Sequence, residues 1–306
     1  MMKVSVVIGV MAAVMLLGAE EIVLTSVGKS PWSKDQESGE IRYQHQGKFS
    51  GIDFTFAGDG GNYYRLTLQG KCDGLAYSPV NLIVRNGDST QFSGVRVTPA
   101  WNPVSSCFFL KNTGETRLTF YLNEKNETCG IQLRDIKLEK LSEDDLKQNI
   151  IQYGNFEETN KLSPDFMSGI NDPASSAVET TEDAVSGKNA AVILMNDTSK
   201  QYVISTTGLP FVPGRKCKVA FWAKAKDKCT VNVTVDFAHK VAQRRNFDLD
   251  QEWRPYSFET TAPQLTGDPQ LETRFCLINF MIPKPEKENK ISIDDLSFIP
   301  VSDGIK

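Results

Sequence analysis

The feature that most constrains this chain is an internal repeat. Strand-like segments occur in the same order in its two halves. The matched positions are Tyr64 with Cys217, Trp101 with Trp253, Thr116 with Thr273, and Asp135 with Asp294. Their separation drifts only from 152 to 159 residues, which indicates a duplicated module with short loop insertions. The repeated tryptophans, Trp101 and Trp253, are expected to share a packing role in the core.

Within each half, short apolar or alternating segments rich in Val, Ile, Phe and Tyr are separated by turn clusters such as "AGDGGN" and "QLTGDPQ". This pattern predicts an all-β protein of two tandem antiparallel β-sandwich (jelly-roll) domains. The first module is expected at 22–140 and the second at 150–301. The stretch 141–149 between them has helical character, with Ser142 placed to cap it, and is interpreted as the linker.

The N-terminus has the pattern of a signal peptide spanning residues 1–19. Lys3 supplies a positive charge, residues 4–18 form an apolar run, and Ala19 offers a small residue for cleavage. The run is shorter than the ~20 residues of a typical membrane-spanning helix, although an uncleaved anchor stays an alternative. We therefore expect a secreted, periplasmic or cell-surface protein that is free of the membrane once the signal is removed.

Composition excludes several classes of function. A net charge of −4 gives no basic footprint for nucleic acid, and two histidines disfavour His-centred metal or triad chemistry. Six cysteines lack C-x-x-C spacing, so we expect small buried thiols rather than a zinc or redox motif. A Cys217–Cys276 disulfide is doubtful, because Cys217 alternates with the core side of its strand and Cys276 faces away from Phe275 and Leu277. The sequence does not determine the oligomeric state.

Several motifs of the second half carry a family resemblance. They are "IIQYGNFEETN" from Ile150, "AVSGKNAAVI" from Ala184, "GRKCKVAFWAKA" from Gly214, "EWRPYSFETT" from Glu252 and the closing "ISIDDLSF". Together they resemble carbohydrate-binding modules of the galactose-binding-like jelly-roll group, in particular families 4, 16 and 22. The resemblance covers most of 148–301, and the first module joins it only through the repeat. It implies a non-catalytic domain whose partner is a poly- or oligosaccharide.

The same resemblance implies a structural calcium ion. Glu157 and one of Asp294 or Asp295 would supply side-chain oxygens, and Asn155 and Lys188 main-chain oxygens, a donor set that suits calcium. Strand alternation places the two adjacent aspartates on opposite faces, so that only one could reach the ion. The alternative is a metal-free site in which the carboxylates accept hydrogen bonds from turn amides.

A glycan site is expected on a sheet face in the second module. Trp222 alternates out of phase with the core residues of its strand, and Asn232, Thr234 and Asp236 face outward on the next strand. If the two strands pair, an aromatic plate and a polar row share one face, as sugar binding requires. A half-buried tryptophan under a loop is the alternative. The repeat partner of Trp222 is Gln69, so the first module would lack the plate.

Two further groups are candidates for ligand contact. Residues 239–247 are expected to form a loop beside the glycan face, where Arg244 and Arg245 would bind acidic sugars or keep the surface charged. Trp32 and Tyr43 are candidates to line a second site near the start of the first module.

Three functions follow in order of support. The first is a secreted, non-catalytic carbohydrate-binding protein, and the second is a structural or adhesive cell-envelope protein that uses its sandwiches for protein contacts. The third, a hydrolase or lyase, is disfavoured because the chain has no G-x-S-x-G motif. Adjacent acids on a strand also point apart rather than into one cleft. The protein is therefore not expected to be an enzyme.

Overall fold

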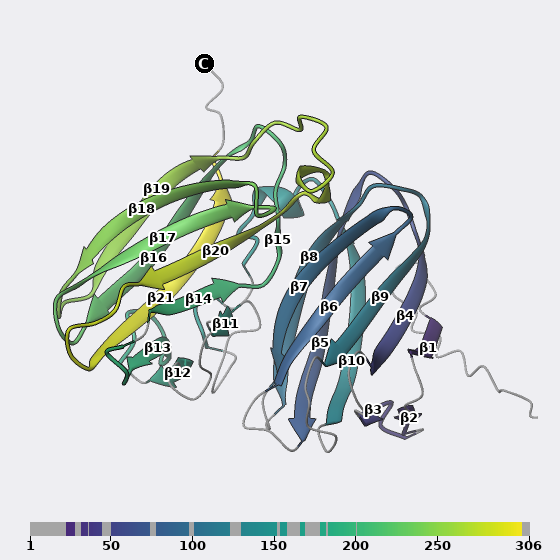
Figure 1. The fold of residues 1–306 in the computed structure, drawn as a ribbon, viewed down its shortest axis with the longest axis horizontal. Coiled ribbons are helices and arrows are strands. Elements are labelled where there is room, and N and C mark those ends of the chain that lie inside the picture. Colours follow the sequence, from purple (N-terminus) through teal and green to yellow (C-terminus); the bar gives the residue numbers. More distant parts are fainter. Residues whose placement is uncertain are drawn as a thin grey trace, which may run out of the picture.

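The computed structural model shows two β-sandwiches side by side, with β1–β10 in one and β11–β21 in the other (Figure 1). It describes residues 23–27, 32–35, 37–44, 50–73, 78–97, 101–122, 130–151, 154–157, 166–168, 178–181, 183–199 and 201–301. The predicted signal peptide and Cys129 lie outside these residues. Within them, no helix is long and apolar enough to cross a membrane.

The first sandwich consists of two five-stranded antiparallel sheets. One sheet has the order β1 (Val23–Val27), β4 (Ser50–Gly58), β9 (Gly114–Leu122), β6 (Ser78–Asn86), β7 (Ser89–Val97). The other has the order β2 (Trp32–Lys34), β3 (Ile41–Gln44), β10 (Gly130–Leu141), β5 (Asn62–Asp73), β8 (Asn102–Leu110).

The second sandwich repeats this plan. Its first sheet has the order β11 (Phe166–Ser168), β14 (Tyr202–Thr206), β20 (Phe275–Ile282), β17 (Cys229–Phe237), β18 (Val241–Leu249), and the short β15 (Leu209–Pro210) also pairs with β20. The second sheet has the order β12 (Val178–Thr181), β13 (Ala190–Met195), β21 (Asn289–Pro300), β16 (Lys216–Ala225), β19 (Arg254–Thr261). Two 3-10 turns complete the described elements, η1 (Asp145–Lys147) and η2 (Leu271–Thr273).

The strand orders confirm the predicted fold class and the repeat. Leaving β15 aside as an insertion, each strand of the first module has a partner at the same place in the second, in the same chain order. The matched sequence segments fall on corresponding strands: β5 with β16, β8 with β19, β9 with β20, and β10 with β21. The chain therefore folds twice into the same antiparallel plan.

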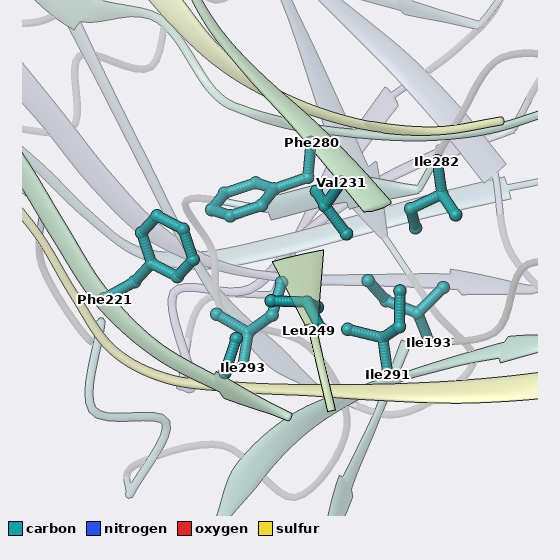
Figure 2. Close-up of a pocket in the computed structure, with 9 residues that line it drawn as sticks. Ile193, Phe221, Val231, Leu249, Phe280, Ile282, Ile291 and Ile293 are labelled. Atoms are coloured by element: carbon teal, nitrogen blue, oxygen red, sulfur yellow. The ribbon is translucent and has the colours of Figure 1, made fainter. Parts of the chain in front are cut away.

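Strand alternation builds each core. In β17, Val231, Val233 and Val235 are buried between the sheets, while the residues between them face outward. Phe221 of the opposite sheet meets Phe280 edge to face, with ring centres 5.1 Å apart. Figure 2 shows the apolar side chains from both sheets that meet at this point: Ile193, Phe221, Val231, Leu249, Phe280, Ile282, Ile291 and Ile293. Because this interior is packed and apolar, a polar ligand has to bind on an outer face.

The closing strand of each module contains a β-bulge at an aspartate. Asp135 has φ of 53° and Asp295 has φ of 48°, and the pairing register shifts at both places. Aspartate tolerates this left-handed conformation better than most residues, because its short side chain can bond locally. The bulge moves Leu296 onto the core side with Ile291 and Ile293. A strict two-residue alternation therefore fails in the middle of "ISIDDLSF".

The stretch predicted as a helical linker contains a single 3-10 turn. Ser142 and Asp145 bond reciprocally: Asp145 N–H donates to Ser142 Oγ at 3.1 Å, and Ser142 N–H donates to Asp145 Oδ2 at 2.7 Å. Leu146 is buried and joins a small cluster with Tyr63 and Phe109 of the first module, against which Val212 of the second module packs. The turn thus lies in a contact between the two sandwiches.

Direct contacts join β5 and β8 of the first module to the residues on either side of β15. Cys107 N–H donates to Gly208 O at 3.1 Å, and Tyr63 Oη donates to Phe211 O at 2.7 Å. The Arg274 guanidinium carbon lies 3.9 Å from the centre of the Phe109 ring. These contacts fix the position of one sandwich against the other.

Two expectations about the second module need correction. Residues 239–247 are not a loop, because most of them form strand β18. Cys276 points into the same core as Cys217, from the facing sheet, because Leu277 and not Cys276 lies on the outer face. Cys217, Cys229 and Cys276 are free thiols, and burial raises the pKa of Cys217 to about 11.

Candidate functional site

A row of side chains crosses the outer face of the β14–β20–β17–β18 sheet. Ser205, Asn279, Thr234 and Arg244 lie directly opposite one another on successive strands. On the same side of β17 lie Asn232 and Asp236. We call this surface the polar face, made of Ser205, Asn232, Thr234, Asp236, Arg244, Asn246 and Asn279.

Hydrogen bonds hold the polar face in a fixed arrangement. Ser205 Oγ donates to Asn279 Oδ1 at 2.5 Å, and Asn232 Nδ2 donates to Asn246 Oδ1 at 2.6 Å. Thr234 Oγ1 donates to Asn232 Oδ1 at 2.9 Å. The Ser205 and Thr234 hydroxyls, both buried, donate their only protons in these bonds. The amide nitrogens of Asn279 and Asn246, in contrast, take no part in the three bonds and can donate to solvent or a ligand.

One end of the polar face carries an ion pair. His239 Nδ1 lies 2.9 Å from Asp236 Oδ2, and this bond raises the pKa of His239 above its ordinary value of 6.5. The imidazole also meets the Phe275 ring edge to face. The electrostatic gain is present below the ordinary pKa of histidine and is lost as the pH rises through the raised value.

The predicted aromatic plate lies elsewhere. Trp222 is on β16, which pairs with β19 and β21 and not with β17. The expected pairing was wrong, because β16 and β17 follow each other in the chain but belong to different sheets. Trp222 therefore lies on the outer face of the opposite sheet, whereas Asn232, Thr234, Asp236 and Arg244 come together on the polar face.

Trp101 and Trp253 share a role, but it is not core packing. Both are partly buried and absent from the apolar cores. The Arg134 guanidinium lies 4.2 Å from the centre of the Trp101 ring, and the Lys224 ammonium lies 5.1 Å from that of Trp253. Each repeat thus places its tryptophan beside a cation of the same sheet, Arg134 from β10 and Lys224 from β16.

The adjacent aspartates both reach one turn. Asp294 Oδ2 accepts N–H bonds from Val185 at 2.9 Å and Ser186 at 3.1 Å, and Ser186 Oγ donates to Asp295 Oδ1 at 2.8 Å. The strict alternation expected for the two aspartates does not hold, because Asp295 lies in a bulge. Asp294 is fully buried, and burial raises its pKa against the lowering effect of the N–H donors.

Glu157 holds the other end of the same loop. Its Oε1 accepts N–H bonds from Lys188 and Asn189, both at 2.8 Å. Asn155 Oδ1 accepts a longer bond from the Glu157 N–H at 3.4 Å. Glu157 and Asp294 thus fasten the 183–189 loop to the opening and closing segments of the second module.

These bonds bear on the predicted calcium site. In the part of the chain that the structure describes, no three His, Cys, Asp or Glu side chains gather as metal ligands. Backbone N–H groups donate to the carboxylates of Glu157 and Asp294. The donor arrangement fits the metal-free alternative, in which turn amides satisfy the carboxylates.

Calcium removal should therefore leave stability unchanged. We expect the same melting temperature in a sample with about 5 mM calcium chloride and in a sample with about 5 mM chelator and no added calcium. The reason is that backbone amides, rather than a cation, hydrogen-bond to the carboxylates of Glu157 and Asp294. Thermal unfolding followed by circular dichroism measures this. A chelator-induced fall that Glu157→Gln abolishes would instead establish the calcium site.

Tyr43 does not line a surface site. Its side chain is buried in the core of the first module, which corrects the expectation. Trp32 pairs with Tyr43 across β2 and β3, and its side chain is outside the description.

Sequence reasoning missed Ser205 and Asn279. They stand out only as polar positions within apolar strands, and nothing in the sequence links them, since 74 residues separate them. The "CLINFM" stretch did contain the signal, because Asn279 alternates out of phase with the core residues Ile278 and Phe280.

Comparison with known proteins yields structural matches only. No protein-family model and no curated protein matches the chain. Among solved structures, the tandem CBM22-1–CBM22-2 domain of Paenibacillus barcinonensis Xyn10C matches 91% of this chain and 93% of its own, at 12% identity and a TM-score of 0.36. TmCBM61 with β-1,4-galactotriose matches 50% of this chain and 99% of its own (15% identity, TM-score 0.38). A CBM4 structure matches 49% and 99% (19% identity, TM-score 0.35). The chain is thus similar to carbohydrate-binding modules, and its two-sandwich fold stands on its own strand pairing.

Proposed function

We propose that this is a secreted, non-catalytic carbohydrate-binding protein whose polar face holds a poly- or oligosaccharide. One observation carries the proposal: Ser205, Asn279, Thr234 and Arg244 form an in-register row across four adjacent strands of one sheet. A row of this kind offers hydroxyl, amide and guanidinium groups at the regular strand spacing of about 4.8 Å.

The chemistry of the row suits a neutral sugar. The side-chain amides of the polar face offer N–H donors and carbonyl acceptors, and a sugar hydroxyl needs both. Val203 and Met281 lie opposite each other beside the row and are partly buried, so they offer an apolar patch for the ring carbons. Binding would be shallow, because the face has hydrogen-bonding groups and a thioether in place of a stacked indole.

The placement of acids supports a binding role without catalysis. Glycosidic hydrolysis uses two carboxyls about 5–10 Å apart. On this face Asp236 and Asp248 are separated by six strand positions, because Asp248 pairs with Thr230, and that spans about 20 Å. The adjacent pair Asp294 and Asp295 is bonded to the Val185–Ser186 turn.

The experiment compares two outer faces of one sandwich. Affinity electrophoresis in neutral polysaccharides (galactan, xylan and mixed-linkage glucan) should show retardation of the wild type. Asn279→Ala should weaken binding about tenfold, since the loss of one or two hydrogen bonds costs about 1.4 kcal/mol. Trp222→Ala, on the opposite sheet, serves as the control and should leave binding unchanged.

Two outcomes would reject this assignment. Equal binding by the wild type and Asn279→Ala would show that the glycan does not bind on the polar face. Loss of binding in Trp222→Ala alone would show that it binds on the opposite sheet. If the wild type binds no glycan in a broad array, the structural or adhesive role takes its place. Melting temperatures of the variants separate lost contacts from lost folding.

A further inference from the structure

The first module exposes an aromatic ring on the sheet that corresponds to the polar face. Phe92 of β7 is 57% exposed, the most exposed large hydrophobic side chain among the described residues. It lies opposite Ile83 on β6, which lies opposite Thr119 on β9, which in turn lies opposite Asp53 on β4. This row crosses the four strands that correspond, in the repeat, to those of the polar face.

The two rows differ in chemistry at matched positions. Phe92 is the fourth residue of β7, as Arg244 is the fourth residue of β18. Arg85 is the penultimate residue of β6, and Asp236 is the penultimate residue of β17. The first module therefore carries a ring and a cation where the second carries a cation and an acid.

Two arginines stand directly opposite each other on this face. Arg85 of β6 pairs with Arg117 of β9, and like charges placed directly opposite destabilise a sheet. Arg117 is partly balanced by Asp53, with Nη1 and Oδ2 3.7 Å apart. Arg85 Nη1 donates to the neutral Thr119 hydroxyl at 3.1 Å, and no described carboxylate lies within ion-pair distance of it.

We propose that this face of the first module binds an anionic saccharide. Phe92 stacks against the apolar side of a sugar ring, while Arg85 and Arg117 bind its carboxylate or sulfate. Arg85 and Phe92 are diagonal neighbours on adjacent strands, close enough to contact one residue of a chain together. The charge of the ligand offsets the repulsion between the two arginines. This proposal adds a second class of saccharide ligand to the proposed function. It concerns the first module, and its residues differ from those of the polar face.

The ligand is a saccharide rather than a nucleic acid on grounds of charge. Nucleic-acid binding relies on many phosphate contacts, whereas the described side chains of this face include two cations close to the acid Asp53, and the chain has a net charge of −4. One exposed ring beside a pair of arginines suits a polymer with one charge per sugar.

The test uses the full chain and polymers that differ only in charge. Polygalacturonate is compared with its methyl-esterified form, and dextran sulfate with dextran, by affinity electrophoresis at about 50 mM and 300 mM salt. The wild type should bind one or both charged forms and bind their neutral counterparts at least about tenfold more weakly. Carboxylate and sulfate ligands are distinguished by which charged polymer binds more tightly.

Variants assign the binding to this face. Arg85→Gln should weaken binding to the charged polymer about tenfold, and Phe92→Ala should weaken it similarly. Lys137→Gln is the matched control, because Lys137 is an exposed cation on β10 in the opposite sheet, and it should leave binding within about twofold.

Three results would overturn the proposal. They are equal binding to charged and neutral polymers, equal losses in Arg85→Gln and Lys137→Gln, or tighter binding to duplex DNA than to either charged polymer. Asn279→Ala separates this proposal from the proposed function. It should not affect the charged polymer, and the anionic site stands even if no neutral glycan binds the second module.

Discussion

Phe280→Ala should lower the free energy of unfolding of the second module by about 3–5 kcal/mol. Phe280 is fully buried at the centre of that sandwich and meets Phe221 edge to face. Alanine would leave a cavity between two sheets whose hydrogen-bonded strands cannot close over it. Urea denaturation followed by far-UV circular dichroism measures the change.

The neighbouring residue provides the control. Met281 follows Phe280 on β20 but lies on the outer face and is only partly buried. Met281→Ala should cost about 1 kcal/mol or less. Equal losses for the two variants would contradict the assigned core of the second sandwich.

Gly154→Ala should be nearly as severe, for a different reason. A Cβ added at Gly154 would lie 2.0 Å from the carbonyl oxygen of Leu296, and the Leu296 N–H donates to Gly154 O at 2.9 Å. The added methyl group would clash with the main chain of β21, which cannot turn aside as a side chain can. The segment around residue 154 therefore has to move away from β21. We expect a loss of about 3 kcal/mol, measured by the same denaturation experiment.

A second glycine separates steric clash from backbone strain. Gly267 has φ of 80° and nothing within 4 Å of an added Cβ. Gly267→Ala should therefore cost only the conformational penalty of about 1–2 kcal/mol. If Gly154→Ala were no worse than Gly267→Ala, the close approach of the opening segment to Leu296 would be wrong.

Much of the fold was predictable because it depends on local patterns. The period-two alternation in "TVNVTVDF" gave the buried and exposed sides of β17 correctly. The repeat placed β5 with β16 and β10 with β21 before any strand was paired. Errors arose where a local irregularity changed the pattern, as at the Asp295 bulge, which moved Leu296 into the core.

The candidate site was predictable only in part. Asn232, Thr234 and Asp236 were identified as candidates from the alternation of their strand, and Arg244 from a stretch expected to be a loop, and the structure gathers all four on one face. Trp222 was joined to them by assuming that consecutive strands pair. In a sandwich, consecutive strands can belong to different sheets. The alternation of apolar residues in a strand does not show to which sheet that strand belongs.

The sequence by itself determined that the chain folds twice into antiparallel sandwiches, because alternation and turn residues act over a few positions. Tertiary structure alone decided which polar residues share a face, since Ser205, Asn279 and Arg244 meet through strand pairing across distant parts of the chain. It likewise decided that Phe92 and the Arg85–Arg117 pair stand together. Register between distant strands is set by the packing of the whole core, and no short segment specifies it.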